Sequence, residues 1–419
     1  MKTKFILAMM TLLMFAYFGE TSSANQPEQD KSFKYSVNDN SWRESANERI
    51  EKFRKADFQI NVIDNQGKAI SNAQVNVKMT KHSFGFGALV GQTRWEGLPN
   101  TEVAQRNKDL VEKYFNKVVT IPTIQPSGDQ MLYWFKERDI KVRGHYLMWA
   151  RIQPGERKGQ PKVMPADKNE LRAQAFQYIK EMLTWSGTRV SEWDVINHIT
   201  TSGHLGYDSL FGFQIFADVI KYAKEIAPHA VMGINDGGIL WGDGPSMEEY
   251  YQVVQKLIKL NAKPDAVGFM SHFREEEFIA MGEIYKRLDK FAALVPHLQL
   301  TEFDIDVTDN QLQADYLRDV MTIAYSHPAI FGIIMWNVWG NNNKALWNQD
   351  GTIKPAGEAW IDLVYNQWWT NITGKTKRSG RFEGRGFLGD YEITVKLGDK
   401  IKTVKYQLVP GVSKIDFVL

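Results

Sequence analysis

The sequence predicts an α/β fold, a (β/α)8 TIM barrel, with a small accessory β-sandwich formed by segments on either side of it. From about residue 84 onward, short apolar segments alternate with longer amphipathic ones, which is typical of parallel strands joined by crossover helices. There are eight such apolar segments, the number that closes a barrel. Around this region, residues 58–79 and 374–419 alternate apolar and polar side chains with a period of two, which predicts antiparallel strands.

The eight predicted barrel strands are short and mostly apolar. They span residues 84–90, 117–121, 141–149, 192–197, 231–235, 266–271, 299–303 and 330–336. Segments between them have helical periodicity, as at residues 169–184, 209–226, 247–260 and 309–325. A doubly wound open sheet is the alternative, but no glycine-rich phosphate-binding loop follows any of these strands. We therefore predict a closed barrel.

The flanking segments are predicted to form one accessory sandwich. Residues 58–63 and 73–79 alternate in polarity around the turn Asp64-Asn-Gln-Gly67, which predicts a β-hairpin. The C-terminal segment has only three or four strands, which is few for an independent fold, so we expect it to pair with the hairpin. An amphipathic helix is expected at residues 41–55. The predicted segments are a signal peptide at 1–24, a linker with this helix at 25–55, the hairpin at 56–80, the barrel at 81–370 and the C-terminal β segment at 371–419.

The N-terminus has the features of a secretory signal. Lys2 and Lys4 precede the apolar run 5–18, which is too short for a comfortable transmembrane span. Small residues at 22–24 predict cleavage before Asn25. We expect a secreted or periplasmic protein that does not contact the membrane once the signal is removed, and a retained membrane anchor is the alternative. The chain has no Cys, which excludes disulfides and thiolate metal sites.

The composition excludes some partners and leaves others open. A formal net charge of +2 with scattered lysines gives no basic stripe, so no nucleic-acid partner is expected. The 13 Trp residues fit a large core, and they also fit a sugar-binding cleft, because the C–H faces of pyranose rings pack on aromatic rings. We expect no cofactor, no metal and no protein partner, and we expect a monomer.

Polar and aromatic side chains gather at the predicted C-terminal ends of the strands, where βα barrels carry their chemistry. They are His145, Trp149, Asn197, His198, Asn235, Asp236, His272, Glu302, Asp304 and Trp336, with Trp347 in the loop after the last strand. A carboxylate such as Glu302 in an apolar strand is unfavourable unless donors surround it. Glu302 is therefore either a nucleophile or base, or one partner of a structural salt bridge.

Five segments resemble motifs of glycoside hydrolase family 10, the xylanase family, and occur in that family's order. Arg143-Gly-His-Tyr-Leu-Met-Trp149 resembles RGHTLVW, and Trp193-Asp-Val-Ile-Asn197 resembles WDVVNE. Residues 265–272 resemble DGIGxQxH, residues 300–305 resemble ITELDI, and residues 332–336 resemble GITVW. The resemblance covers about residues 83–365. It implies a barrel that hydrolyses β-linked glycans, xylan in particular, with a retaining mechanism.

The resemblance assigns roles to the matched residues. Glu302 matches the nucleophile, and His272 matches the histidine that hydrogen-bonds it. Asn197 matches the residue that contacts the sugar 2-hydroxyl, a contact that strengthens in the transition state. The glycone site is implied at His145 and Trp149, and its floor at Trp336.

Four further residues complete the predicted site by their position. Asn235 and Asp304 are expected to support the nucleophile, since Asp304 shares a strand face with Glu302. Asp236 and Trp347 are expected to contact substrate, and Asp236 is also the best placed of the acids that could replace a missing proton donor. Asp194 is expected on the opposite face from Asn197, with a structural role.

The chain departs from the family pattern at three places. His198 stands where the family has its acid/base glutamate. Pro122-Thr-Ile-Gln-Pro126 replaces the ENEMKW stretch that contacts the glycone sugar, and Ala150 replaces a histidine. The first difference affects the mechanism, and the other two affect the choice of xylan as substrate.

A histidine at the acid/base position leaves three interpretations open. Imidazolium is a competent general acid and neutral imidazole a competent base, and we expect the Glu302 carboxylate to raise the pKa of His198 above ~6.5. The protein is then an active glycosidase, of xylan or of another glycan. Alternatively, the loss of acid assistance leaves an impaired carbohydrate-binding protein. A metal site formed by His198 and His204 with Asp236 or Glu302 is the third interpretation.

Overall fold

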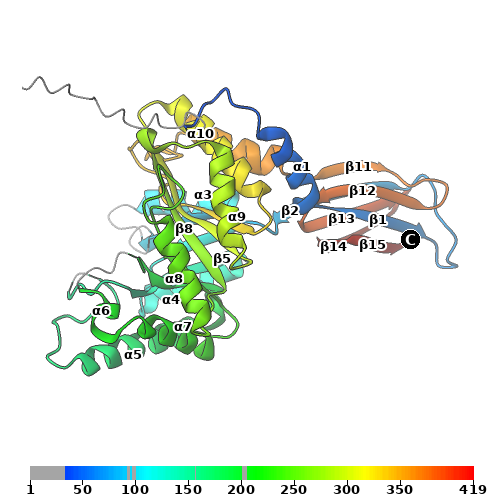
Figure 1. Ribbon diagram of the computed structural model, residues 1–419. Coiled ribbons are helices and arrows are strands. Elements are labelled where there is room, and N and C mark those ends of the chain that lie inside the picture. The colour runs from blue at the N-terminus through cyan, green and yellow to red at the C-terminus, as the bar shows by residue number, and fades with distance from the viewer. Residues whose placement is uncertain (1–33, 92–94, 97–100, 156, 201–204) are drawn as a thin grey trace, which may run out of the picture. The chain divides into compact units, whose positions relative to one another are not determined.

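The computed structural model describes residues 34–91, 95–96, 101–155, 157–200 and 205–419. Eight parallel strands close into a barrel in the order β10-β3-β4-β5-β6-β7-β8-β9 (Figure 1). Their bounds are β3 (Gly85–Leu89), β4 (Lys117–Thr120), β5 (Lys141–Trp149), β6 (Glu192–Asn197), β7 (Val231–Asp236), β8 (Ala266–Arg274), β9 (Leu298–Asp306) and β10 (Ile330–Met335). The predicted barrel is confirmed, and the doubly wound alternative is wrong because β10 pairs with β3. The predicted signal peptide lies outside the described residues.

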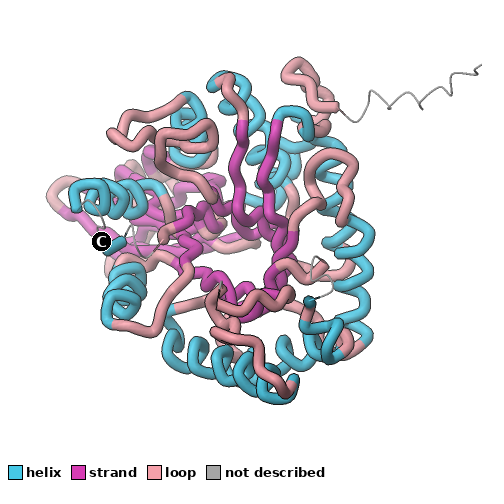
Figure 2. Tube along the Cα trace, turned by 90° about the vertical axis from the view of Figure 1, so that its left-hand side faces the viewer, coloured by secondary structure: helices cyan, strands magenta, loops and turns pink. Residues whose placement is uncertain are grey.

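Helices surround the strands, as Figure 2 shows. They are α3 (Thr101–Tyr114), α4 (Pro126–Glu137), α5 (Lys168–Ser186), α6 (Tyr207–Phe211), α7 (Gln214–Ile226), α8 (Met247–Lys259), α9 (Met281–Ala292), α10 (Asn310–Ser326) and α11 (Pro355–Ile361). The helix predicted at 209–226 is two helices, because Gly212 has φ 72° and ends α6. In the part of the chain that the structure describes, no helix is both long enough and apolar enough to cross a bilayer.

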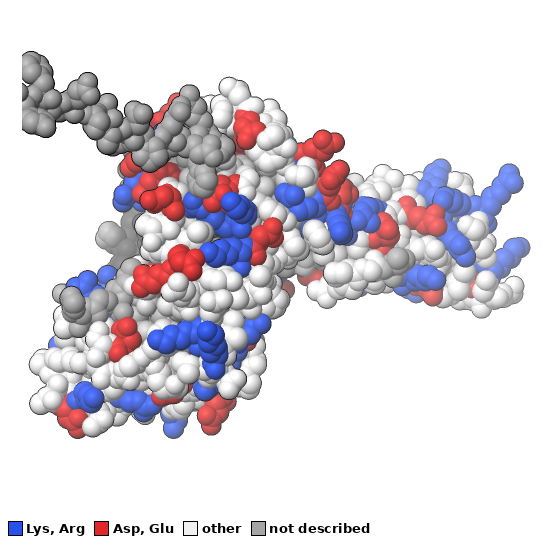
Figure 3. Space-filling view, in the orientation of Figure 1, with Lys and Arg blue, Asp and Glu red and all other residues white. Residues whose placement is uncertain are grey.

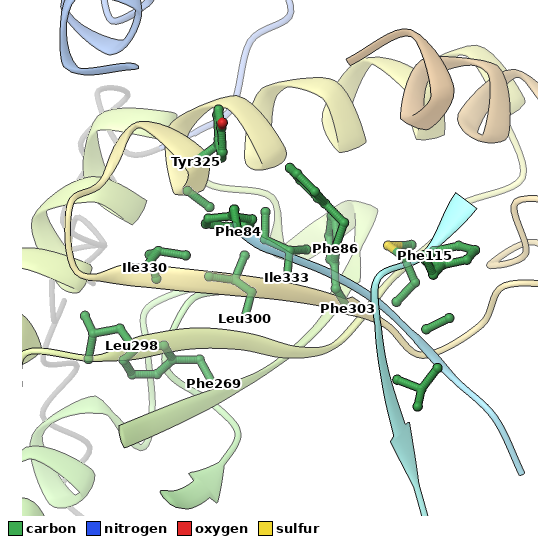
Figure 4. Packing of buried hydrophobic residues seen from close by; sticks show 14 of the residues in the cluster. Phe84, Phe86, Phe115, Phe269, Leu298, Leu300, Phe303, Tyr325, Ile330 and Ile333 are labelled. Carbon is green, nitrogen blue, oxygen red and sulfur yellow. The ribbon is translucent and has the colours of Figure 1, made fainter. Parts of the chain in front are cut away.

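The main core lies between the barrel strands and the helices. Figure 4 shows Phe86 of β3 and Ile333 of β10 among the buried side chains, together with Phe84 and with Tyr325 of α10. The ring centroids of Phe84 and Tyr325 are 4.9 Å apart in an edge-to-face arrangement. Full burial of each such side chain stabilises the fold by about 1.5–3 kcal/mol. This packing fixes the strands whose C-terminal ends carry the polar residues.

Two sheets form the accessory β-sandwich, in the orders β12-β1-β15 and β11-β2-β13-β14. Their strands are β1 (Lys55–Ile63), β2 (Gln74–His82), β11 (Asn371–Lys375), β12 (Arg381–Phe387), β13 (Gly389–Leu397), β14 (Lys400–Leu408) and β15 (Val412–Val418). Strands from before and after the barrel share each sheet, so the predicted sandwich is confirmed. The two sheets are linked where Tyr391 Oη donates to the Phe387 carbonyl at 2.5 Å.

The predicted hairpin is wrong in its pairing. The turn Asp64–Gly67 exists, since Gly67 N donates to Asp64 O at 3.0 Å, but β1 and β2 lie in different sheets. One edge of β1 pairs with β12 and the other with β15, so no edge remains for β2. The period-two pattern records which side chains face the interior, and it does not specify the partner strand.

Helix α1 (Arg43–Arg54) joins the sandwich to the barrel and confirms the predicted N-terminal helix. Arg43 Nη2 lies 2.7 Å from Asp319 Oδ1 of α10. At the other end of α1, Arg54 donates to the carbonyls of Tyr325, His327 and Ile330 at 2.6, 2.6 and 2.7 Å. Burial lowers the pKa of Arg54 to about 10, so its guanidinium stays charged at neutral pH.

Candidate active site

A cleft of about 360 Å³ opens at the C-terminal ends of the barrel strands. Its lining residues come from β5, β6 and β9 and from the chain that follows β4, β5, β6 and β10. They are Ile121, His145, Tyr146, Trp149, Arg157, Lys158, Asn197, His198, Glu302 and Trp336. The structure therefore brings most of the residues predicted to be catalytic or to bind substrate to one cleft.

Glu302 lies at the middle of β9, where the strand contains a bulge. Between the pairs Met270–Thr301 and His272–Asp304, β9 has one more residue than β8. Glu302 has φ 52°, a left-handed conformation that is uncommon for any residue other than glycine. Such a conformation costs about 1–3 kcal/mol and is concentrated at functional sites. The bulge directs the Glu302 carboxylate into the cleft.

Two donors hold the two oxygens of Glu302. Asn235 Nδ2 donates to Oε1 at 2.9 Å, and His272 Nε2 lies 3.1 Å from Oε2. On its other side, His272 Nδ1 lies 3.0 Å from Asp304 Oδ2. Burial alone lowers the pKa of His272, but the carboxylates of Asp304 and Glu302 outweigh it and raise the pKa to about 9. A protonated His272 thus bridges two carboxylates at neutral pH. Of the three predicted supporting residues, Asn235 and His272 contact Glu302 directly, and Asp304 reaches it through His272.

Asn235 is fixed by a buried amide network. Its Nδ2 also donates to Asn197 Oδ1 at 3.0 Å, and its Oδ1 accepts from Thr301 Oγ1 at 2.6 Å. Gly268 of β8 leaves the space for this side chain, because a Cβ at Gly268 would lie 2.6 Å from Asn235 Oδ1. The motif at residues 265–272 therefore needs a glycine at this position, because a larger residue would occupy the space of Asn235, which holds Glu302.

Below the cleft, His145 is held by a buried ion network. His145 Nδ1 lies 2.8 Å from Asp194 Oδ2, and Asp194 also binds Arg143. Asp194 thus has the structural role that was predicted, but the prediction that it faces away from Asn197 is wrong. A register shift between Asp194 and Ile196 inserts an extra residue into β6, so both side chains reach the barrel interior.

His198 stands opposite these groups and packs against Trp149, with ring centroids 4.3 Å apart. Its backbone is left-handed, with φ 57°. Burial lowers the pKa of His198 to about 4, and the opposing effect of Glu302 is too small to reverse this. The expectation that Glu302 raises the pKa of His198 above its ordinary value is therefore wrong. Above pH ~5 His198 is a neutral imidazole.

Two predicted substrate contacts lie away from the cleft lining. Asp236 is buried behind His198, with Oδ1 3.8 Å from His198 Nδ1, a distance too long for a hydrogen bond. Thr200 donates to Asp236 Oδ2 through its backbone N at 2.7 Å and its hydroxyl at 2.8 Å. Burial nevertheless raises the pKa of Asp236 to about 6.

Trp347 is the second of these residues, and its predicted role is corrected by its position. It is buried in the core, where it stacks on Tyr114 with ring centroids 5.5 Å apart. The loop after β10 turns back toward α3, and this carries the indole away from the strand ends. In contrast, Trp336 lines the cleft and makes edge contacts with His145 and His272.

Four cleft residues were absent from the predicted set: Ile121, Tyr146, Arg157 and Lys158. Arg157 lies over the Trp149 ring, with its guanidinium carbon 4.1 Å from the ring centroid. Lys158 Nζ donates to the Ile121 carbonyl at 3.0 Å. The two basic residues lie in a loop without periodicity, and the one available signal was their position in the loop that follows β5.

The metal interpretation gains no support here. Within the described ranges there is no group of three or more His, Asp or Glu side chains that could hold a metal ion. His204, which that interpretation requires, lies outside them.

Comparison with known proteins adds the family and the fold. The sequence model described as glycosyl hydrolase family 10 matches residues 78–363. Anti-sigma-I factor RsgI6 of Acetivibrio thermocellus is 28% identical over 390 residues, which cover 90% of this chain and 48% of that protein. Endo-1,4-beta-xylanase 2 of Arabidopsis thaliana is 23% identical over 84% of this chain and 33% of that protein. The chain thus spans half or less of the length of these curated relatives.

Among solved structures, xylanase 10B from Thermotoga petrophila in complex with xylobiose has a TM-score of 0.59 and 19% identity. The match covers 68% of this chain and 95% of the other. Native xylanase 10B from Thermotoga maritima has a TM-score of 0.59, and the match covers 68% of this chain and 96% of the other. At this identity the likeness shows a shared barrel fold.

Proposed function

Because the chain belongs to glycosyl hydrolase family 10, we propose that it hydrolyses a β-linked polysaccharide or oligosaccharide with Glu302 as nucleophile and His198 in the acid/base position. The observation that carries the proposal is the way Glu302 is held. One oxygen accepts from Asn235 and the other faces His272, in a cleft that His198 also lines. This arrangement keeps a carboxylate oriented at the bottom of a sugar-sized opening.

In the first step, a Glu302 oxygen attacks the anomeric carbon and the bond to the leaving-group oxygen breaks. The product is a glycosyl ester on Glu302. The protonated His272 stabilises the carboxylate before attack, because its positive charge lies between Glu302 and Asp304. We assign the contact with the sugar hydroxyl next to the reacting carbon to Asn197, and the hydrogen bond that it receives from Asn235 supports this assignment.

In the second step, neutral His198 accepts a proton from the water that attacks the ester, and Glu302 is released. A neutral imidazole suits this base role at neutral pH. In contrast, only the small protonated fraction of His198 can protonate a leaving oxygen. We therefore propose that activated substrates are cleaved at neutral pH and that unactivated glycosidic bonds are cleaved best in acid.

The test is trapping of the glycosyl ester with 2-deoxy-2-fluoro sugars carrying a dinitrophenyl leaving group, in xylosyl, glucosyl and disaccharide forms. The protein should gain the mass of one sugar, on the peptide that contains Glu302. Glu302→Gln should gain none, and the exposed control Glu248→Gln should be labelled like the wild type. Labelling of another carboxylate, or no labelling combined with no turnover of any glycan, would overturn the assignment.

A second candidate function is glycan binding without turnover, which the low pKa of His198 favours because little acid is available at neutral pH. Titration calorimetry with the same glycans separates the two. Binding with no hydrolysis at any pH from 4 to 8 would support the binding protein.

We also propose that residues 1–24 direct export and are removed. Support comes from the charged start, the short apolar run and the small residues before Asn25. N-terminal sequencing of the protein from the culture medium or periplasm tests this, with a start near Asn25 expected and a start at Met1 contradicting it.

A further inference from the structure

The charges in the cleft differ from those on the face of the molecule that Figure 3 shows. On the face seen in Figure 3, basic and acidic side chains are interspersed over the barrel helices. The cleft lining instead contains two basic side chains, Arg157 and Lys158, and a single carboxylate, Glu302. Burial lowers the pKa of Lys158 from its ordinary value. Among the described residues, no Asp or Glu oxygen lies within 4.0 Å of either cation. The described residues that line the cleft therefore carry an excess of basic side chains.

The two cations are held in place by neighbouring loops. Arg157 lies over the Trp149 ring and donates through Nε to Gln153 Oε1 at 3.2 Å. Lys158 is tied to the carbonyl of Ile121, at the end of β4. Within the same loop, Gly155 N donates to Pro161 O at 2.9 Å. These contacts present a guanidinium and an ammonium group at the cleft.

The chemistry of this wall favours an acceptor that carries negative charge. Arg and Lys offer donors and no acceptors, and Ile121 adds an apolar side chain. Burial raises the pKa of the nearby Tyr146 to about 12, so its hydroxyl stays neutral and adds no negative charge. A neutral sugar that covers this wall would remove water from two cations without compensating their charge, which is unfavourable. A carboxylate or sulfate group would pair with them through charge-assisted hydrogen bonds.

We propose that the glycan of this cleft carries an anionic group, a uronate carboxylate or a sulfate ester, which Arg157 and Lys158 bind beside the sugar that lies at Glu302. The inference rests on the proposed function in assuming that a glycan occupies the cleft. It names the substrate class, an acidic β-linked glycan, which the family alone does not supply.

Binding is measured by titration calorimetry with the full chain and three oligosaccharides of the same backbone. One carries a glucuronic acid substituent, the second is its carboxyl-reduced neutral form, and the third is sulfated. The acidic forms should bind at least about tenfold more tightly than the neutral form, and this advantage should shrink as NaCl rises. Whichever of the uronate and sulfate forms binds more tightly identifies the anionic group that the cleft prefers.

The variants Arg157→Gln and Lys158→Gln should each lower the affinity for the acidic form about tenfold and lower the affinity for the neutral form much less. Lys162→Gln is the matched control, since Lys162 is exposed in the same loop and does not line the cleft. Equal binding of acidic and neutral forms, or equal effects of Arg157→Gln and Lys162→Gln, would overturn the inference.

Hydrolysis of the same oligosaccharides separates this inference from the proposed function. Tight binding of the acidic form without cleavage at any pH overturns the hydrolase proposal and keeps the anionic ligand. Cleavage of the acidic and neutral forms with equal efficiency, with cleavage of the acidic form insensitive to Arg157→Gln, overturns the anionic ligand and supports the hydrolase.

Discussion

At the scale of single residues, the charge state of His198 decides which half of the reaction the protein can assist. Its pKa is near 4 because the ring is largely buried against Trp149, and Glu302, His145, Arg157, His272 and Asp236 are the charged or titratable groups around it. Protonated His198 is the acid for glycosylation, and neutral His198 is the base for deglycosylation. The two steps should therefore have opposite pH dependences.

For a substrate with a poor leaving group, kcat/KM should rise about tenfold per pH unit as pH falls from 7 toward 5, because the protonated fraction of His198 rises by that factor. For a dinitrophenyl glycoside, which needs no acid, kcat should stay level from pH 8 to 5 and fall only near pH 4. Steady-state kinetics across this range measure both. His198→Ala should flatten the first profile, and an unchanged slope in this variant would show that another group supplies the proton.

His272 provides a residue-scale prediction for stability. Its pKa is about 9 in the folded protein and ~6.5 when unfolded, so the folded state binds the extra proton between these values. The stabilisation by its ion pairs is complete below pH ~6.5 and is lost as pH rises to about 9. Urea midpoints at pH 6.5, 7.5, 8.5 and 9.5 should fall more steeply for the wild type than for His272→Gln. The exposed control His297→Gln should follow the wild type, and equal slopes for all three would contradict the assignment.

At the scale of strands, the sequence pattern was enough to place the barrel strands but not to orient every side chain on them. The predicted strand 192–197 has the bounds of β6, and all six of its residues are buried although three of them are polar or charged. The bulge between Asp194 and Ile196 has no sequence signal, so the face assigned to Asp194 was wrong. The predicted pairing of β1 with β2 is wrong for a similar reason. Their alternation of apolar and polar residues predicts which side chains face the interior, but it does not predict the neighbouring strand.

The sequence motifs predicted part of the cleft and missed the rest. Glu302, His272 and Asn197 lie in segments that resemble family motifs, and the structure brings them together. Arg157 and Lys158 lie in a loop whose path depends on tertiary contacts. The low pKa of His198 depends on burial, which a single sequence does not reveal.

Gly268 of β8 gives a prediction at this scale. An added Cβ would lie 2.6 Å from Asn235 Oδ1, so Gly268→Ala must move the side chain that donates to Glu302. A displacement of this kind should reduce kcat roughly 100-fold with a smaller change in KM. The control is Gly233→Ala on β7, where the nearest atom to an added Cβ is 3.4 Å away. Activity of Gly268→Ala equal to that of Gly233→Ala would show that the position of the Asn235 side chain does not affect catalysis.

At the scale of the whole molecule, the sandwich and the barrel are coupled through α1. Arg54 at the end of this helix donates to three carbonyls. One lies in α10, one in the turn between α10 and β10, and one at the start of β10. The sandwich strands come from both ends of the described chain and β1 follows α1 directly, so a disturbance at Arg54 reaches both parts. Unfolding should accordingly be one cooperative transition.

Arg54→Met tests this coupling. The substitution keeps a long apolar stem but leaves three carbonyls without their donor, which should lower the free energy of unfolding by about 2 kcal/mol. Lys52→Met on the exposed side of the same helix is the control and should change stability by less than ~0.5 kcal/mol. Urea unfolding is followed by tryptophan fluorescence, which reports mainly the barrel, and by far-UV circular dichroism, which reports both parts. Coincident midpoints that shift together in Arg54→Met support a coupled molecule, because weakening the link then destabilises both parts at once. Separate transitions in the wild type, or an Arg54→Met shift no larger than that of Lys52→Met, would mean that the sandwich and barrel unfold independently and that α1 is not the connection between them.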